Sequence, residues 1–408
     1  METKSNYNKF LLLWAGELVS SIGGGLTSFG LGVYVFRETG SASGMALVSL
    51  LAFLPMLLLS APAGVLADRY DRRLLMMIGD GLSALGLIYI LACMFNGGAS
   101  LYQICIGVFI SSVFSSLLEP SYRATVSDLL TKEEFSKANG MVSLAGSARY
   151  LISPLIAGIL LEVSDIKLLL IIDISTFILT VISTGVVRKG LETKIIEDKD
   201  NFLTSFKEGF KAVYERKGVF YLIIVSSIMT CFMGAIQILC EPMILDFNDA
   251  KTLGIAETVC AMGMLVTSII LGAKGIKKGY VKFLAGSLFI AGISMVMFGV
   301  FENIYLIGLF GFIFFAMLPF ANNCLDYLTR TNIPDELMGR AWGIIGFISQ
   351  MGYVVAYGFG GILADATAKH MNISVGRGAA IVVMASGLLL AATSVVMYSL
   401  KEVRSLEK

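Results

Sequence analysis

The sequence is poor in charged residues and almost lacks histidine. Lys, Arg, Asp and Glu make up 15% of its 408 residues, whereas a soluble domain carries about a quarter. With His370 as the single histidine, any proton chemistry has to rest on carboxylates. A net charge of +1 provides no basic field for nucleic acid. Together with 56% hydrophobic residues, this composition indicates an integral membrane protein.

Motifs for nucleotides, metals and enzymatic chemistry are also missing. There is no Gly-x-x-x-x-Gly-Lys-Ser/Thr loop, so ATP does not drive this chain directly. The six cysteines lie inside apolar runs and have no metal-ligand spacing. No cluster of His, Cys and acids suits a membrane enzyme. We therefore expect no cofactor, no metal and no enzymatic activity.

Hydropathy predicts an all-α integral membrane protein with twelve transmembrane helices. Each apolar segment has about 20 residues or more, the length that a bilayer core requires. The first is too long for a signal-peptide core and lacks a small-residue cleavage site, so it is expected to remain as a span. The predicted spans are 10–36, 44–66, 74–96, 101–120, 139–161, 167–187, 218–244, 252–273, 282–301, 305–328, 341–363 and 377–399.

The distribution of Lys and Arg predicts the orientation. With a cytoplasmic N-terminus, 25 of the 31 basic residues lie in cytoplasmic segments and five lie in exterior loops. The opposite topology would invert this ratio and violate the positive-inside rule. We expect a multi-pass protein of the cell membrane with both termini in the cytoplasm.

A long polar stretch divides the chain into two halves of six spans. Residues 188–217 carry eight Lys and Arg residues and form a predicted linker between 1–187 and 218–408. Within it, 202–214 is either an amphipathic helix on the membrane surface or an unstructured tether. The loop after span 8, Gly272–Lys278, stands where the charged loop 64–73 stands in the first half. We interpret it as a degenerate repeat of that loop.

The stretch Gly64–Arg73 packs five charges into six residues between two spans. Its Gly-Val-Leu-Ala-Asp-Arg-Tyr-Asp-Arg-Arg resembles the signature loop of the major facilitator superfamily, and its Asp-Arg-x-Asp-Arg-Arg form is closest to the macrolide efflux branch of drug exporters. Pro120–Arg123 and Met338–Trp342 are similar to segments of the same branch. The resemblance implies two pseudo-symmetric six-helix bundles that alternate access to a central site.

The resemblance also implies a conformational latch at this loop. Asp68 would end helix 2 beside the start of helix 11, where the helix N-terminus and Arg340 attract an anion. The arginines of the loop would meet acids on neighbouring helix ends, such as Glu119 or Asp128, while Asp71 is predicted to cap helix 3. The predicted latch residues are Gly64, Asp68, Arg69, Arg72, Arg73 and Arg340. The alternative is a positive-inside topology anchor.

Ionisable residues inside spans are candidates for function, because their insertion costs free energy. Glu17, among small polar neighbours such as Ser20, is either a protonatable site or cation contact, or a structural acid. Arg149 near the middle of helix 5 is its expected partner, as an ion pair that switches or one that is permanent. Asp80 and Asp173 are expected to be structural.

The second half offers a further candidate face. Met229, Met233, Gln237 and Glu241 recur at four-residue intervals on helix 7. The first three would line a cavity for varied apolar shapes, with Glu241 as an outer acid that contacts protons or substrate. The alternative is a stripe that faces lipid or other helices, with Glu241 at the headgroups. Asp326 is a further cavity candidate near the cytoplasmic end of helix 10, with an interfacial role as its alternative.

The predicted function is secondary active transport of an amphiphilic drug such as a macrolide, in exchange for protons. The alternative is export or flipping of a lipid, lysolipid or siderophore, which an unpaired Arg149 would favour. Expected partners are a small amphiphilic substrate, protons and membrane lipids, with no nucleic acid and no ATP. A channel or receptor would not require two six-helix halves with a repeated loop.

Overall fold

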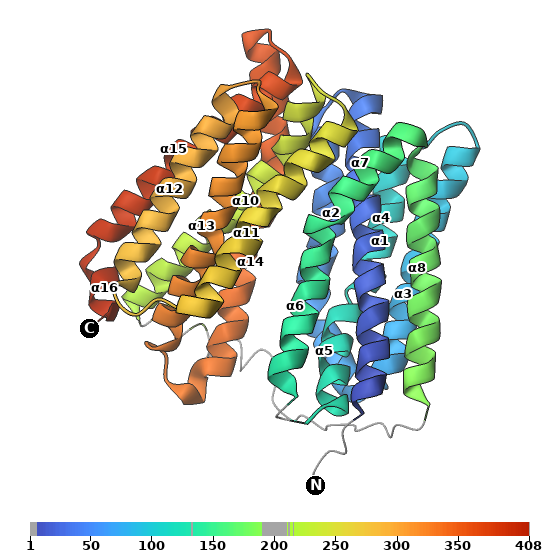
Figure 1. Ribbon diagram of the computed structural model, residues 1–408, viewed down its shortest axis with the longest axis horizontal. Helices are drawn as coiled ribbons and strands as arrows, with labels where there is room; N and C mark the ends of the chain where they lie inside the picture. Colours follow the sequence, from blue (N-terminus) through green and yellow to red (C-terminus); the bar gives the residue numbers. More distant parts are fainter. Residues whose placement is uncertain (1–5, 132–133, 190–209, 211–212, 215, 408) are drawn as a thin grey trace. The chain divides into compact units, whose positions relative to one another are not determined.

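The computed structural model describes residues 6–131, 134–189, 210, 213–214 and 216–407, without the side chains of 136, 335–337, 339 and 340 (Figure 1). Twelve helical segments in these ranges are long and apolar enough to cross a membrane, as predicted. The helices are α1 (Tyr7–Thr39), α2 (Ala42–Arg69), α3 (Arg72–Phe95), α4 (Leu101–Ser115), α5 (Leu118–Leu129), α6 (Phe135–Leu151), α7 (Ser153–Val163), α8 (Ile166–Arg188), α10 (Lys217–Leu245), α11 (Ala250–Lys274), α12 (Tyr280–Val300), α13 (Ile304–Arg330), α14 (Asp335–Met371), α15 (Val375–Ser399) and α16 (Lys401–Arg404).

Two of the spans are broken helices, and a proline follows each break. α4 ends at Ser115 and α5 begins at Leu118, with Pro120 in its first turn. α6 ends at Leu151 and α7 begins at Ser153, followed by Pro154. Proline lacks an amide hydrogen and its ring displaces the carbonyl four residues earlier, which interrupts the helix. Spans 4 and 5 therefore each consist of two helices.

The chain forms two compact units, which are described separately. Unit 1 contains Met1–Thr39 and Leu47–Asp198, and unit 2 contains Gly40–Ala46 and Lys199–Lys408. The first residues of α2 thus belong to unit 2 and the remainder to unit 1. We call the end of each unit where α8 ends or α10 begins the linker side. Most of 202–214, where a surface helix or tether was expected, lies outside the described residues.

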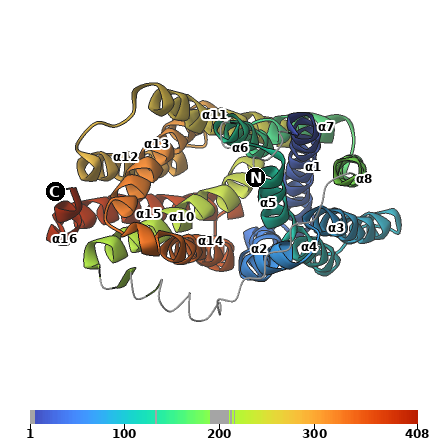
Figure 2. The ribbon, with the colours of Figure 1, turned by 90° about the horizontal axis from the view of Figure 1, so that it is seen from below.

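Small residues allow the helices of unit 1 to pack closely. α1 packs against α6, α7 and α8, while α3 packs against α4, α5 and α8 (Figure 2). A Cβ added at Gly86 on α3 would lie 2.2 Å from the carbonyl oxygen of Gly107 on α4. The Ser83 hydroxyl donates to the carbonyl oxygen of Ser111 at 3.0 Å. Such contacts are typical of helix packing in membranes, where close approach replaces the hydrophobic effect.

Unit 2 uses the same kind of contact. α10 packs against α14 and α15, α12 against α13 and α15, and α11 against α13. A Cβ at Gly263 on α11 would lie 2.2 Å from the carbonyl oxygen of Phe312, so these two helix backbones approach closely. The loop Gly272–Lys278 begins at the end of α11, where Gly275 has a φ of 61°. α12 then starts without a side-chain cap.

The outward surface is apolar. Large hydrophobic side chains are exposed along the spans, including Phe109, Ile178, Ile269 and Phe359. In water such a surface would be costly, whereas in a bilayer it faces hydrocarbon. The protein is therefore a multi-pass membrane protein whose polar faces and buried acids need a specific explanation.

Candidate functional site

The linker-side end of unit 1 holds a cluster of charges around Asp128 of α5. Nη1 of Arg72 lies 2.8 Å from Oδ1 of Asp128, and Nη2 of Arg73 lies 3.2 Å from Oδ2. Arg72 also reaches Asp68 at 3.4 Å. The Arg73 side chain is only 2% exposed. Of the two acids proposed for these arginines, Asp128 receives them, whereas Glu119 pairs with Arg123 on the surface.

Asp71 joins the same turn to α8. Its carboxylate accepts a hydrogen bond from the amide of Arg73 at 3.1 Å, which confirms the predicted cap of α3. Its other oxygen accepts from Nε of Arg188 at 2.7 Å. A cap satisfies an amide that the helix leaves unpaired. The turn between α2 and α3 is therefore held to both α5 and α8.

Two other predicted latch residues, Asp68 and Arg69, lie at the edge of this cluster. Asp68 is 47% exposed and Arg69 is exposed. A Cβ at Gly64 would meet no atom within 4 Å, so no close approach in the structure requires glycine there. The side chain of Arg340 lies outside the described residues.

α1 carries a polar face within the span. Glu17, Ser21, Gly24 and Ser28 recur at helical spacing, are partly or fully exposed, and thus share one side of the helix. The Ser21 hydroxyl donates to Oε1 of Glu17 at 3.4 Å, and Ser20 beside it is half-buried. Since polar groups facing hydrocarbon are costly, this face is suited to water or to another polar surface.

α6, the neighbour of α1, has a comparable face. Asn139, Ser143, Gly146 and Tyr150 are exposed along one side of the helix. Arg149 is exposed as well. The expected ion pair between Glu17 and Arg149 is absent from the described part of the chain, because the two side chains make no contact within 4.0 Å. Unit 1 therefore presents an acid and a base that do not neutralise each other directly.

Two further acids are buried in unit 1. Asp173 on α8 is 1% exposed and Asp80 on α3 is 4% exposed. The Thr176 hydroxyl lies 3.4 Å from Oδ1 of Asp173, and Gly23 on α1 leaves room for that carboxyl group. These contacts agree with the hydrogen-bonding role expected for Asp173.

In unit 2, tyrosines of α14 cover the predicted methionine face of α10. The Tyr353 hydroxyl lies 3.0 Å from the sulfur of Met233, and the Tyr357 hydroxyl donates to Oε1 of Gln237 at 3.0 Å. Met229 is buried, whereas Met233 and Gln237 are partly exposed. Asp326 on α13 is exposed, within electrostatic range of Arg330. Flexible methionines beside aromatic rings form a surface that adapts to varied apolar shapes.

A second acid near Glu241 was missed by sequence reasoning. Glu257 on α11 lies within electrostatic range of Glu241. Oε2 of Glu241 has less than 1 Å² of exposed surface and no hydrogen-bond partner. The signal in the sequence was a glutamate seven residues into a largely apolar helix whose lysines, Lys251 and Lys274, lie in its first and last turns.

Asp365 on α14 is the other residue that sequence reasoning missed. Its carboxylate accepts from the Ala42 amide at 2.9 Å, the Ser43 amide at 3.0 Å, and the hydroxyls of Ser41 and Ser43 at 2.7 and 2.5 Å. It thereby caps the first turn of α2, where an anion is favoured. The sequence Ser41-x-Ser43 before an apolar run indicated a helix start. It did not identify Asp365 as the acceptor, because that residue lies over 300 positions later in the chain.

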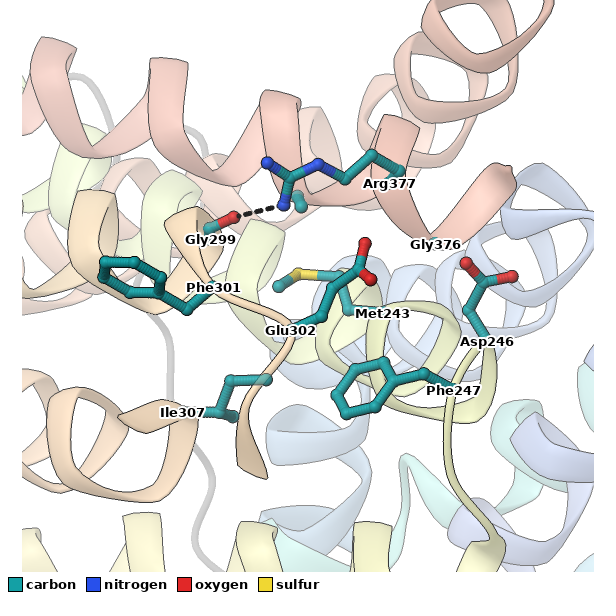
Figure 3. Close-up of a pocket in the computed structure, with 10 residues that line it drawn as sticks. Met243, Asp246, Phe247, Gly299, Phe301, Glu302, Ile307, Gly376 and Arg377 are labelled. Atoms are coloured by element: carbon teal, nitrogen blue, oxygen red, sulfur yellow. Dashed lines mark hydrogen bonds between the residues drawn. The ribbon is translucent and has the colours of Figure 1, made fainter. Parts of the chain in front are cut away.

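A small pocket lies on the side of unit 2 opposite the linker (Figure 3). Asp246 and Glu302 line it together with Arg377, which donates to the Gly299 carbonyl at 3.0 Å. Ser374 donates to Asp246. Arg377 satisfies carbonyl groups that the end of α12 leaves unpaired, which is a common role for arginine at a helix C-terminus. The polar side chains of this pocket therefore serve to join helix ends, and we do not assign a ligand to it.

Comparisons with known proteins agree with this architecture. The model of the Major Facilitator Superfamily matches residues 13–357. Macrolide efflux protein A of Streptococcus pyogenes is 26% identical over 377 residues, covering 90% of this chain and 92% of the relative. The Staphyloferrin A transporter of Staphylococcus aureus is 24% identical over 358 residues, covering 84% and 85%. A crystal structure of a bacterial homologue of the iron transporter ferroportin in an inward-facing state superimposes with a TM-score of 0.75 at 14% identity, covering 97% of this chain and all of the other.

Proposed function

The chain belongs to the Major Facilitator Superfamily of secondary transporters, and we propose that it exports amphiphilic drugs such as macrolides in exchange for protons. Macrolide efflux protein A, a relative aligned over nine tenths of both chains, supports this cargo class. The methionine and tyrosine face of α10 and α14 suits a large, variable and mostly apolar substrate. We also propose that the linker side is cytoplasmic, because the segments there hold 25 of 31 basic residues.

Alternating access requires contacts that hold at one membrane face while the other face opens. α2 has an acid-centred contact near each of its ends. At the linker side, Arg72 bridges Asp68 and Asp128. At the opposite side, Asp365 holds the start of the helix. We infer that α2 is the element whose end contacts form and break during transport.

Glu17 is the observation that carries proton coupling. It is an acid inside a span, on a polar face, with Ser21 as its hydrogen-bond partner and no ion pair among the described residues. A carboxyl group without a fixed cation gains and loses a proton more readily than a permanently paired one. In the proposed cycle, protonation of Glu17 and binding of a cationic drug exclude each other.

The test is transport by the purified protein in proteoliposomes with an imposed pH gradient. We expect uptake of a radiolabelled macrolide that follows the gradient and stops with a protonophore. Glu17→Gln should lose gradient-driven uptake and keep macrolide exchange at equal pH. Glu38→Gln, an exposed acid at the end of the same helix, is the matched control and should behave like the wild type. Gradient-driven uptake by Glu17→Gln at the wild-type rate would contradict the role of Glu17.

An anionic cargo is the second candidate, and the exposed Arg149 favours it. A guanidinium on the polar side of unit 1 without an ion pair could bind a phosphate or carboxylate of a lipid, lysolipid or siderophore. Arg149→Gln separates the two proposals. Macrolide transport should persist in this variant, whereas transport of an anionic cargo should fall by about tenfold or more, the effect of losing one charge-assisted hydrogen bond.

A further inference from the structure

The hairpin formed by α10 and α11 carries one glutamate on each helix near its turn. Glu241 lies four residues before the end of α10, and Glu257 lies seven residues after the start of α11. At about 1.5 Å per residue, they are roughly 6 and 10 Å from the hairpin's turn, at similar depth in the span. Each helix supplies one carboxyl group, the two helices pack against each other, and the two groups are within electrostatic range.

No basic side chain in the described ranges forms an ion pair with either glutamate. The two glutamates form no ion pair or hydrogen bond with any other described residue. The neighbouring titratable groups on these two helices are the free thiols of Cys240 and Cys260, which carry no positive charge. Lys251, at the start of α11, lies within electrostatic range of Asp249.

The groups on the other helices packed against the hairpin are already engaged. On α14, Tyr357 donates to Gln237 and Asp365 accepts from the start of α2. On α15, Arg377 donates to carbonyl groups at the end of α12. On α13, Asp326 and Arg330 stand at the linker-side end, away from the hairpin's turn. In the described part of the chain, the two carboxyl groups therefore have no basic side chain as an ion-pair partner.

Two carboxylates within electrostatic range of each other in a medium of low dielectric constant cannot both remain ionised at low cost, and such a pair retains a proton. Oε2 of Glu241 is sealed from solvent and has no donor among the described residues, so protonation of the pair removes an uncompensated buried charge. Both side chains are only partly buried as a whole, which leaves a route for that proton to exchange.

We propose that Glu241 and Glu257 together bind one exchangeable proton and form the proton-coupling site of unit 2. The inference rests on the proposed proton-linked transport and adds a named site to it. The proton enters from the aqueous phase nearest the turn of the hairpin as the pair binds it. When the proton leaves to water on the other side, both carboxylates are negatively charged. This doubly charged pair is unfavourable inside the protein, and binding of another proton or of a cationic drug relieves it.

The first test reads the proton directly and does not require a cargo. Infrared difference spectra of the purified full-length protein, recorded between acidic and alkaline pH, should show a protonated carboxyl band that shifts in D2O. Glu241→Gln with Glu257→Gln should remove the part of this band that belongs to the pair. Glu302→Gln, an exposed acid on the same side of unit 2, is the control and should leave the band unchanged. A spectrum of the double variant identical to that of the wild type would overturn the proposal.

The second test connects the pair to transport. Each single Gln variant should lose macrolide uptake driven by a pH gradient and retain exchange at equal pH, while Glu241→Asp, which keeps the acid, should retain part of the driven uptake. Because Gln keeps the shape and removes buried charge, thermal stability should be unchanged or higher. Full gradient-driven uptake by the double variant would refute the site. Wild-type uptake that ignores the gradient would instead refute proton coupling, while the infrared result would still decide whether the pair holds a proton.

Discussion

Asp365 on α14 accepts hydrogen bonds from both the amide and the hydroxyl of Ser43, at 3.0 and 2.5 Å. The two residues are separated by 322 positions in the chain, yet one carboxylate caps the helix that starts at Ala42. α2 is therefore fixed at its first turn by another helix. This gives the start of α2 a contact that a single substitution can remove.

Asp365→Ala should destabilise the protein by about 2 kcal/mol, because it leaves two amides of the first turn of α2 without their acceptor. Asp365→Asn should lose less, since its amide oxygen can still accept. Thermal unfolding in detergent measures the difference. Glu38→Gln, an exposed acid one loop earlier, is the control and should unfold with the wild type. Equal midpoints for Asp365→Ala and the control would show that the contact contributes nothing.

Asp128→Asn should destabilise unit 1 by about 3 kcal/mol. The substitution leaves the buried Arg73 without a carboxylate and leaves Arg72 with Asp68 alone, and an unpaired buried charge is costly. Glu119→Gln is the matched control, because it breaks a surface pair whose side chains are 64% and 70% exposed. That pair should contribute less than about 1 kcal/mol. Thermal unfolding in detergent measures both variants. An equal loss of stability in Asp128→Asn and Glu119→Gln would contradict the prediction.

Asp249 should make stability depend on pH below about pH 4. Its carboxylate accepts from the Thr252 amide at 2.8 Å, and this hydrogen bond holds the pKa of Asp249 below its ordinary value. A lowered folded-state pKa stabilises the protein above the unfolded-state value of about 3.9, and the contribution is lost as pH falls through the folded-state pKa.

Asp249→Ala should therefore cost about 1 kcal/mol at neutral pH, a typical value for a lost cap, and the difference from the wild type should shrink below about pH 4. Asp249→Asn keeps an acceptor that does not titrate and serves as the control. Thermal midpoints of the three proteins between pH 7 and pH 3 provide the measurement. A wild-type advantage over the alanine variant that grows with acidity would have the wrong sign.

Gly86→Ala should destabilise the α3–α4 contact by about 2 kcal/mol, the usual effect of overpacking. Its Cβ would lie 2.2 Å from the Gly107 oxygen and 2.8 Å from the Ser111 nitrogen, both backbone atoms that cannot rotate away. Gly81→Ala lies on the same helix with no atom within 4 Å of the added Cβ, and should be neutral or stabilising by up to about 1 kcal/mol. Thermal unfolding of both variants provides the measurement. A lower midpoint for Gly81→Ala than for Gly86→Ala would contradict the prediction.

Sequence reasoning reached some parts of the candidate site and missed others. Asp71 as a cap and Asp128 as an arginine partner were predictable, because a cap is local and the acid ends a neighbouring span. Glu257 was missed because its significance depends on Glu241 across the hairpin. The absence of a Glu17–Arg149 pair was equally out of reach, because it depends on the rotation of α1 and α6 about their axes.

The sequence by itself determined the twelve spans and the membership of the superfamily. Both follow from quantities that are local along the chain: the length of an apolar run needed to cross a bilayer, and the Asp68–Arg73 segment between two such runs. Only the tertiary structure decided which charges meet, such as Asp365 with Ser43 and Arg73 with Asp128. A helix presents a different side chain every 100°, so these pairs depend on how each helix is rotated and packed, and packing is a property of the whole unit.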